Sequence, residues 1–131
     1  MTHDPVREFV RSFNERDLDA FVGVLDPGVE LHSMKGLRKG REAARLWATR
    51  EPGGVQQTIE LGELFEDGDR ALALVKRVWR WEEDGSHATT EQMAWLFELR
   101  DHRIRSWRPF EDREAAWRAY HLRDGAGRGD Q

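Results

Sequence analysis

The sequence contains no cysteine among its 131 residues, which excludes disulfide bonds, thiolate nucleophiles and cysteine-based metal sites. It contains no apolar run near the roughly 18 residues that a membrane-spanning helix needs, so no membrane partner is expected. The first residues, Met1 to Pro5, lack the basic stretch followed by an apolar stretch that is typical of a secretory signal. We therefore expect a cytoplasmic protein.

The sequence also lacks a charge pattern typical of nucleic-acid binding. Its 21 Lys and Arg residues are set against 25 Asp and Glu residues, for a formal net charge of -4, and the two signs are interspersed. A nucleic-acid interface would need a basic face, so that partner is not expected. The histidines do not show the spacing of a metal site, and there is no phosphate loop or dinucleotide-binding fingerprint. No metal and no cofactor are therefore expected.

Aromatic residues are what the chain does contain in quantity, with six Trp and six Phe. Each of these side chains buries a large area, so a core can form although only 38% of the residues are hydrophobic. The length is typical of one domain. We predict a single domain over residues 1–122 and a flexible, Gly-rich tail at residues 123–131.

The first third of the chain has the apolar spacing of helices. Val6, Phe9, Val10 and Phe13 recur with helical period, after an Asp4-Pro5 pair suited to a helix start. Further helices are predicted around residues 18–25 and 41–50, with a short strand at residues 29–33 between them and a turn around Gly36 and Gly40. A closing helix is predicted around residues 112–122.

The second half changes to a period of two, which indicates strands. Four strands are predicted at about residues 55–66, 70–81, 87–100 and 103–110. Tight turns separate them at Asp67-Gly68, Asp84-Gly85 and Asp101-His102. Long strands joined by tight turns predict an antiparallel meander.

Hairpin register decides which side chains share a face of that sheet. The predicted inner face, which the helices should cover, carries Leu72, Leu74, Lys76, Val78, Glu91, Met93, Trp95, Phe97, Ile104, Ser106, Arg108 and Phe110. The predicted outer face carries Ala73, Val75, Arg77, Trp79, Trp81, Gln92, Ala94, Leu96, Arg105 and Trp107. Three tryptophans on an uncovered face are more apolar surface than a monomer usually exposes, so we predict a homodimer through it.

Several segments resemble the nuclear transport factor 2-like superfamily, in particular its SnoaL-like and ketosteroid-isomerase-like branch. They are Phe13–Phe21, Gly40–Ala44, Glu66–Ala71, Phe97–Asp101 with Ile104, and Asp112–Ala116. The resemblance implies an α+β fold: a cone-shaped, curved antiparallel sheet, made of the four-stranded meander and a short strand, with N-terminal helices covering its concave face around one pocket.

The steroid-isomerase reaction itself is not implied. That enzyme type uses a tyrosine on the first helix, a carboxylate base at the end of the first short strand and a protonated acid on the third long strand. The corresponding positions here are Phe9, Ser33 and Trp95, and none of these side chains can take those roles.

Two residues are candidate catalytic groups. His32, at the end of the short strand, is either a general base or a histidine of the pocket rim that bonds to backbone. Glu91 is the other candidate base. Together with Arg108 on a neighbouring strand, it either holds a polar ligand or forms a structural ion pair.

The candidate ligand-binding residues are Trp47, Met93, Trp95, Arg108 and Phe110. Their aromatic rings suit a small apolar or aromatic molecule, although the same pattern is also typical of a plain hydrophobic core, which we favour for Phe13 and Phe97. Two functions follow. The first is a cofactor-free isomerase, cyclase or dehydratase that acts by proton transfer, and the alternative is a non-catalytic ligand-binding or dimeric accessory module. A protein-interaction subunit, a third possibility, would place the important residues on the tryptophan face.

Overall fold

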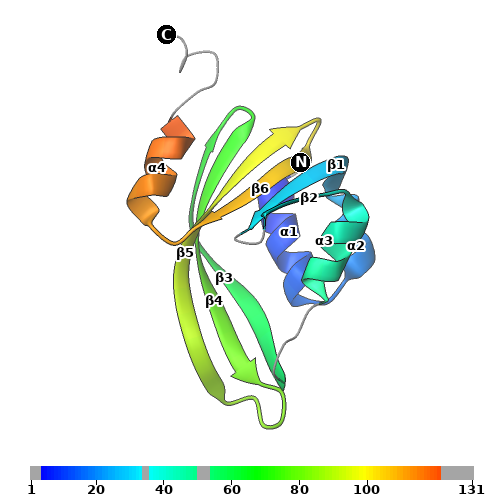
Figure 1. Cartoon of the computed structure of the whole chain (residues 1–131), viewed down its shortest axis with the longest axis vertical. Helices are drawn as coiled ribbons and strands as arrows, with labels where there is room; N and C mark the ends of the chain where they lie inside the picture. Colours follow the sequence, from blue (N-terminus) through cyan, green and yellow to red (C-terminus); the bar gives the residue numbers. More distant parts are fainter. Residues whose placement is uncertain (1–3, 34–35, 50–53, 122–131) are drawn as a thin grey trace.

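The computed structural model describes residues 4–33, 36–49 and 54–121. Figure 1 shows a long, curved sheet with the N-terminal helices packed against one side and the C-terminal helix on the other. The helices are α1 (Pro5–Asn14), α2 (Leu18–Gly23), α3 (Arg41–Ala48) and α4 (Arg113–His121). The strands are β1 (Leu25–Ser33), β2 (Gly36–Lys39), β3 (Val55–Asp67), β4 (Arg70–Trp81), β5 (His87–Arg100) and β6 (Arg103–Phe110).

The sheet has the strand order β2-β1-β6-β5-β4-β3. The α+β class, the meander of β3 to β6 and the cover of N-terminal helices are confirmed. Two details differ from the prediction, because β2 forms where only a turn was expected and β1 pairs with β6 in parallel. The flexible tail predicted at residues 123–131 lies outside the described residues. No described helix is long and apolar enough to span a membrane.

Local signals start the first two helices. Asp4 caps α1, where its Oδ1 accepts a hydrogen bond of 3.2 Å from the Arg7 N–H, and Pro5 occupies the first turn. Asp17 caps α2 in the same way, accepting from the Ala20 N–H at 3.2 Å. Between them Arg16 takes a positive φ of 60°, which turns the chain from one helix to the next.

Asn14, at the end of α1, attaches that helix to the edge of the sheet. Its Nδ2 donates to the Ile59 carbonyl oxygen, and the Ile59 N–H donates to Asn14 Oδ1, both at 2.8 Å. The amide thus pairs with β3 as a neighbouring strand would. Arg16 adds a hydrogen bond of 3.1 Å to the Gln57 carbonyl oxygen. The end of α1 therefore lies beside Ile59, in the first half of β3.

The main core lies between α1, α2, α3 and the concave face. Its aromatic members are Phe9, Phe13, Phe21, Trp47, Trp95, Phe97 and Trp107. Phe97 is fully buried and Phe13 is 3% exposed, as their assignment to the core predicts. A smaller core lies on the convex face, where α4 packs its buried Ala116 and Tyr120 against Leu72, Ala94 and Leu96. The expectation that no helix covers this face was therefore wrong.

Candidate functional site

The register of the β4–β5 hairpin decides which side chains face the helices, and it differs from the predicted register by one residue. Four residues form the loop, because the Trp81 N–H donates to the Ser86 carbonyl oxygen at 2.9 Å. A bulge at Ala88 then shifts the pairing, so that Trp79 pairs with Thr89 and Arg77 with Glu91. The loop has two residues more than predicted, and a shift of two by itself would keep every side chain on its predicted face. The bulge adds one further residue, and this odd shift moves the β4 side chains to the face opposite the predicted one.

A second bulge, at Arg105, has the same effect in β6. Near the turn Leu99 pairs with Ile104 as predicted, but beyond the bulge Phe97 pairs with Trp107 and Leu96 with Arg108. Trp107 therefore joins the concave core and is only 2% exposed. The predicted outer face with three tryptophans is wrong, because Trp79, Trp81 and Trp107 all lie on the concave side.

Three of the predicted site residues are separated from the others by the sheet itself. Arg108 and Phe110 are on the convex face, where the guanidinium of Arg108 lies 5.3 Å from the ring centre of Phe110. His32 also points away from the core, because Leu31 is the buried neighbour on β1. Its Nε2 is 3.7 Å from Glu30 Oε1. The predicted placement of Arg108 and Phe110 on the inner face was therefore wrong, and all three residues lie across the sheet from Trp95.

A polar cluster occupies the concave face just beyond the end of the covering helices. Arg77 of β4 is its centre. Its Nε donates to Gln57 Oε1 at 3.0 Å, and its Nη1 lies 3.9 Å from the Met93 sulfur. Glu91 Oε1 is 4.0 Å from the same Nη1. The cluster was missed in part because the predicted register placed Arg77 and Trp79 on the opposite face from Glu91 and Met93.

The charge of Arg77 is largely removed from water but only partly balanced. Its side chain is 19% exposed, and burial lowers the pKa of its guanidinium, an effect that the negative charge of Glu91 only partly offsets. The guanidinium nevertheless stays charged at neutral pH. Among the described residues, Nη2 has no hydrogen-bond partner. Arg77 can therefore offer N–H groups to a bound molecule.

Glu91 is held by the neighbouring tryptophan. Trp79 Nε1 donates to Glu91 Oε1 at 3.0 Å, and the Glu91 side chain is 50% exposed. Trp79 is itself half-buried, and its ring centre lies 5.2 Å from the guanidinium carbon of Arg77. One carboxylate oxygen is thus engaged, whereas Oε2 has no partner in the part of the chain that the structure describes. This oxygen is available as a proton acceptor.

Trp47 and Trp95, two of the predicted ligand-binding residues, lie in the aromatic core behind this cluster. Trp95 is fully buried, and Trp47 of α3 packs 6.3 Å from it and 4.9 Å from Trp107, between ring centres. The indole N–H groups of Trp95 and Trp107 are buried without a hydrogen-bond partner among the described residues. A polar group that reached them would find two unused donors.

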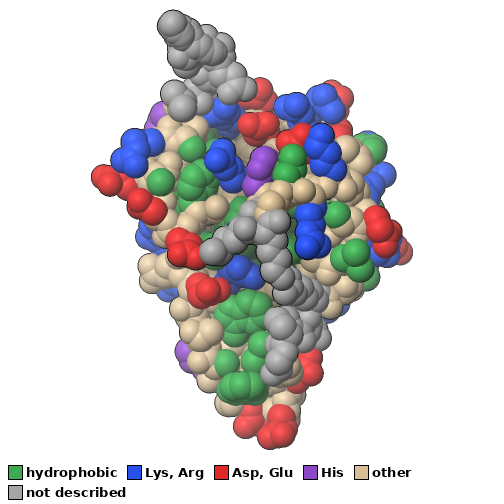
Figure 2. All heavy atoms as spheres, viewed as in Figure 1, with side chains coloured by type: hydrophobic (Ala, Val, Ile, Leu, Met, Phe, Trp, Pro, Cys, Tyr) green, Lys and Arg blue, Asp and Glu red, His purple; other side chains and the backbone are tan. Residues whose placement is uncertain are grey.

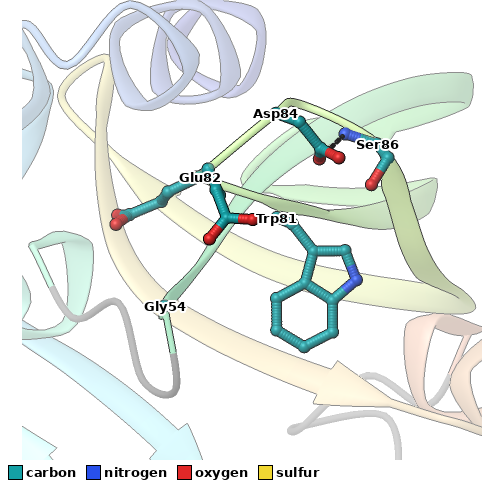
Figure 3. Close-up of a pocket in the computed structure, with 6 residues that line it drawn as sticks. Gly54, Trp81, Glu82, Asp84 and Ser86 are labelled. Carbon is teal, nitrogen blue, oxygen red and sulfur yellow. Dashed lines mark hydrogen bonds between the residues drawn. The ribbon is translucent and has the colours of Figure 1, made fainter.

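Trp81 continues the concave surface toward the hairpin tip. It is 47% exposed, and Figure 3 shows its indole beside a pocket that the acidic hairpin borders, where Asp84 Oδ1 accepts from the Ser86 N–H at 2.9 Å. Figure 2 shows hydrophobic side chains gathered on the part of the sheet below the helices, with acidic side chains at the tip. We call the concave surface formed by Gln57, Arg77, Trp79, Trp81, Glu91 and Met93 the β4 strip.

A comparison with known protein families identifies the family of this chain. Residues 6–107 match the SnoaL-like domain. The chain belongs to the SnoaL-like domain family. A comparison with curated proteins finds no match.

Solved structures resemble this SnoaL-like domain in fold. An LEH-like epoxide hydrolase of M. tuberculosis has a TM-score of 0.69 at 17% identity, covering 88% of this chain and 86% of the other. A putative polyketide cyclase of Sinorhizobium meliloti has a TM-score of 0.67 at 22% identity, covering 80% and 92%. A Mycobacterium tuberculosis protein in complex with estradiol-17β-hemisuccinate has a TM-score of 0.68 at 14% identity, covering 80% and 88%. At these identities the likeness establishes the fold alone, and other structures with TM-scores of 0.70 and 0.68 are described as ketosteroid isomerase-like in fold and as NTF2-like.

Proposed function

We propose that this SnoaL-like domain binds a small organic molecule on the β4 strip, with its polar group at Arg77 and its apolar part against Trp79 and Met93. The observation that carries the proposal is the largely buried Arg77 guanidinium, whose Nη2 has no hydrogen-bond partner among the described residues. A buried charge without a close carboxylate partner is costly, and such groups are typical of functional sites. Trp47 would form the inner wall of the same site, with the fully buried Trp95 packed behind it.

The relatives support a small-molecule role without identifying the ligand. One structure of this fold was solved with estradiol-17β-hemisuccinate, and others are an epoxide hydrolase and a putative polyketide cyclase. Because the fold serves many functions, the chain's own residues carry the proposal.

A fragment screen by two-dimensional NMR tests the binding site. Aromatic fragments that bind the domain should shift the side-chain signals of Gln57, Arg77 and Trp79. The variant Trp79→Ala should lose these hits, whereas Leu46→Ala, at a position 59% exposed on α3, should keep them. Hits that shift only residues of α4 would place the ligand elsewhere and contradict the proposal.

Proton transfer by Glu91 is the second candidate function, and the geometry of its carboxylate favours it. Trp79 fixes Oε1 and leaves Oε2 without a partner among the described residues. Oε2 could take a proton from a carbon beside a carbonyl group, while Arg77 stabilises the negative charge that develops on the carbonyl oxygen. Return of the proton to another atom of the substrate would complete an isomerisation.

Deuterium exchange separates this reaction from binding alone. The probe 2-tetralone carries exchangeable protons next to a carbonyl on a flat bicyclic frame. An active enzyme should incorporate deuterium from D2O into it faster than buffer does, and Glu91→Gln should reduce the rate to that of buffer. Unchanged exchange in the Gln variant would exclude Glu91 as the base. Binding without exchange above the buffer rate would favour the non-catalytic alternative.

We also propose a homodimer through the convex face, although the three tryptophans that first suggested it lie on the concave side. The support is apolar surface that α4 leaves partly exposed, namely Leu74, Phe110 and Trp117, the last at 43%. Sedimentation equilibrium should show a dimer that Phe110→Glu disrupts, and a monomer at micromolar concentration would refute the proposed dimer.

The cytoplasmic location expected from the sequence remains a prediction.

A further inference from the structure

The β4 strip runs from a cationic group at one end to an acidic hairpin at the other. At its inner end Arg77 presents a cationic group, 19% exposed, between Gln57 and Met93. At its outer end the hairpin carries the acidic residues Glu82, Glu83 and Asp84, all exposed. Trp79 and Trp81 lie between these ends on the same face, because side chains two residues apart in a strand point to the same side.

Glu91 does not satisfy the hydrogen-bond donors of Arg77. The nearest oxygen, Oε1, is 4.0 Å from Arg77 Nη1 and already accepts the Trp79 N–H at 3.0 Å. A hydrogen bond between nitrogen and oxygen needs about 2.7–3.2 Å. Of the five N–H donors of an arginine, only those on Nε and Nη1 have contacts among the described residues. The remaining donors suit an oxyanion, which arginine binds better than it binds a neutral oxygen.

We infer that the ligand of this site is an aromatic organic acid, whose carboxylate binds Arg77 and whose ring system lies along Trp79 toward Trp81. This inference rests on the proposed binding function and adds the charge class and the orientation of the ligand. The acidic hairpin disfavours the reverse orientation, since a carboxylate placed there would face three negative side chains. The half-buried indole of Trp79 and the exposed indole of Trp81 accept a flat ring through stacking.

A matched pair of probes tests the charge of the ligand. The probe 2-naphthoate carries a carboxylate, whereas 2-naphthamide has nearly the same shape without charge. Titration of the full chain by calorimetry should show naphthoate binding at least about tenfold more tightly, since charge-assisted hydrogen bonds exceed neutral ones by that order. Arg77→Gln should remove this preference, so that naphthoate binds no more tightly than naphthamide, and a cooperative unfolding transition in urea reports that the variant is folded.

Glu91→Gln should change the affinity for naphthoate in the opposite direction from Arg77→Gln. If an anion binds beside Glu91, removal of that negative charge should strengthen naphthoate binding and widen its preference over naphthamide. Weaker naphthoate binding in this variant would overturn the inference, because Glu91 would then be helping to hold the ligand.

The remaining outcomes distinguish the inference from the proposed function. Equal affinity for the two probes, with Trp79→Ala still abolishing both, would overturn the anionic ligand and keep the binding site. A preference for naphthoate that survives in Arg77→Gln would overturn the role of Arg77. No binding of either probe at millimolar concentration would refute both the inference and the proposed function.

Discussion

Trp79 and Glu91 are joined across the β4–β5 ladder by a side-chain hydrogen bond of 3.0 Å, although Trp79 pairs with Thr89 and Glu91 with Arg77. The contact is therefore diagonal, two residues along the strand, where a long aromatic side chain can still reach. It brings together the ring that forms the apolar wall of the proposed site and the carboxylate that is its candidate base.

A double-mutant cycle measures this contact. Trp79→Phe keeps an aromatic ring without the N–H group, and Glu91→Gln removes the charged acceptor. Because Glu91 is half exposed, we expect a coupling free energy of only about 0.5–1 kcal/mol in urea denaturation. Strictly additive effects of the two substitutions would show that the hydrogen bond does not persist in solution.

Asn14 should be more important for stability than its half-buried position suggests. Its side chain makes two hydrogen bonds of 2.8 Å to the backbone of Ile59 on the edge strand. Asn14→Ala should cost about 1–3 kcal/mol of unfolding free energy, since both backbone groups lose a partner. Glu15→Ala is a matched control one residue away, because the exposed Glu15–Arg11 ion pair should contribute less than about 1 kcal/mol. Equal losses would mean that water replaces Asn14 without cost.

Most of the fold follows from patterns that are local in the sequence. The period of two and the turn residues predicted β4, β5 and β6 with the bounds that the structure shows. Asp4 and Pro5 likewise marked the start of α1. Strand β2 was missed because all four of its residues are exposed, so no alternation of polar and apolar residues reveals it.

The faces of β4 could not be predicted from the sequence, because both are apolar over its first half. Ala71, Ala73 and Val75 face the main core, whereas Leu72 faces the core under α4. A strand covered on both sides lacks the alternation that fixes its register. The bulges at Ala88 and Arg105 add one residue each without a glycine or proline to mark them. Glu91, Met93 and Trp95 were nevertheless correctly placed on the helix side of the sheet, where Arg77, and not Arg108, is the cation near Glu91.

Asp26 predicts a pH dependence of stability. Its Oδ2 accepts the Gly28 N–H at 2.9 Å and lies 3.5 Å from Arg100 Nη2. The backbone hydrogen bond, more than Arg100, lowers the pKa of Asp26 below its ordinary value of 3.8. A lowered pKa in the folded state stabilises the fold above pH 3.8, and this contribution is lost as the pH falls through the folded-state pKa.

Asp26→Asn tests this contribution, because it keeps an acceptor for Gly28 and removes the charge. We expect it to lower the unfolding free energy near neutral pH by about 0.5–1 kcal/mol. The difference from the wild-type protein should shrink at pH values below 3.8. Urea denaturation across this range measures it. A difference that stays constant with pH would show that the charge of Asp26 does not contribute.

The buried indole of Trp95 leads to the last prediction. Its N–H has no hydrogen-bond partner among the described residues, although the ring is fully buried against Phe9, Phe97 and Trp107. A buried donor without a partner costs about 1–3 kcal/mol. Trp95→Phe removes that cost but also leaves a small cavity, which has a penalty of similar size. We therefore expect the two effects nearly to cancel, with a net change within about 1 kcal/mol.

Phe97→Ala is the comparison, because it only removes packing, and it should cost about 3–5 kcal/mol in the same urea denaturation. The edge-to-face arrangement of Trp95 and Trp107, with ring planes at 82° and centres 5.3 Å apart, could give the N–H a weak contact with a ring face. That contact is too weak to change the expected ranking of the two variants. If Trp95→Phe costs as much as Phe97→Ala, the indole N–H has a strong acceptor in the folded protein and is not an unused donor behind the inner wall of the ligand site.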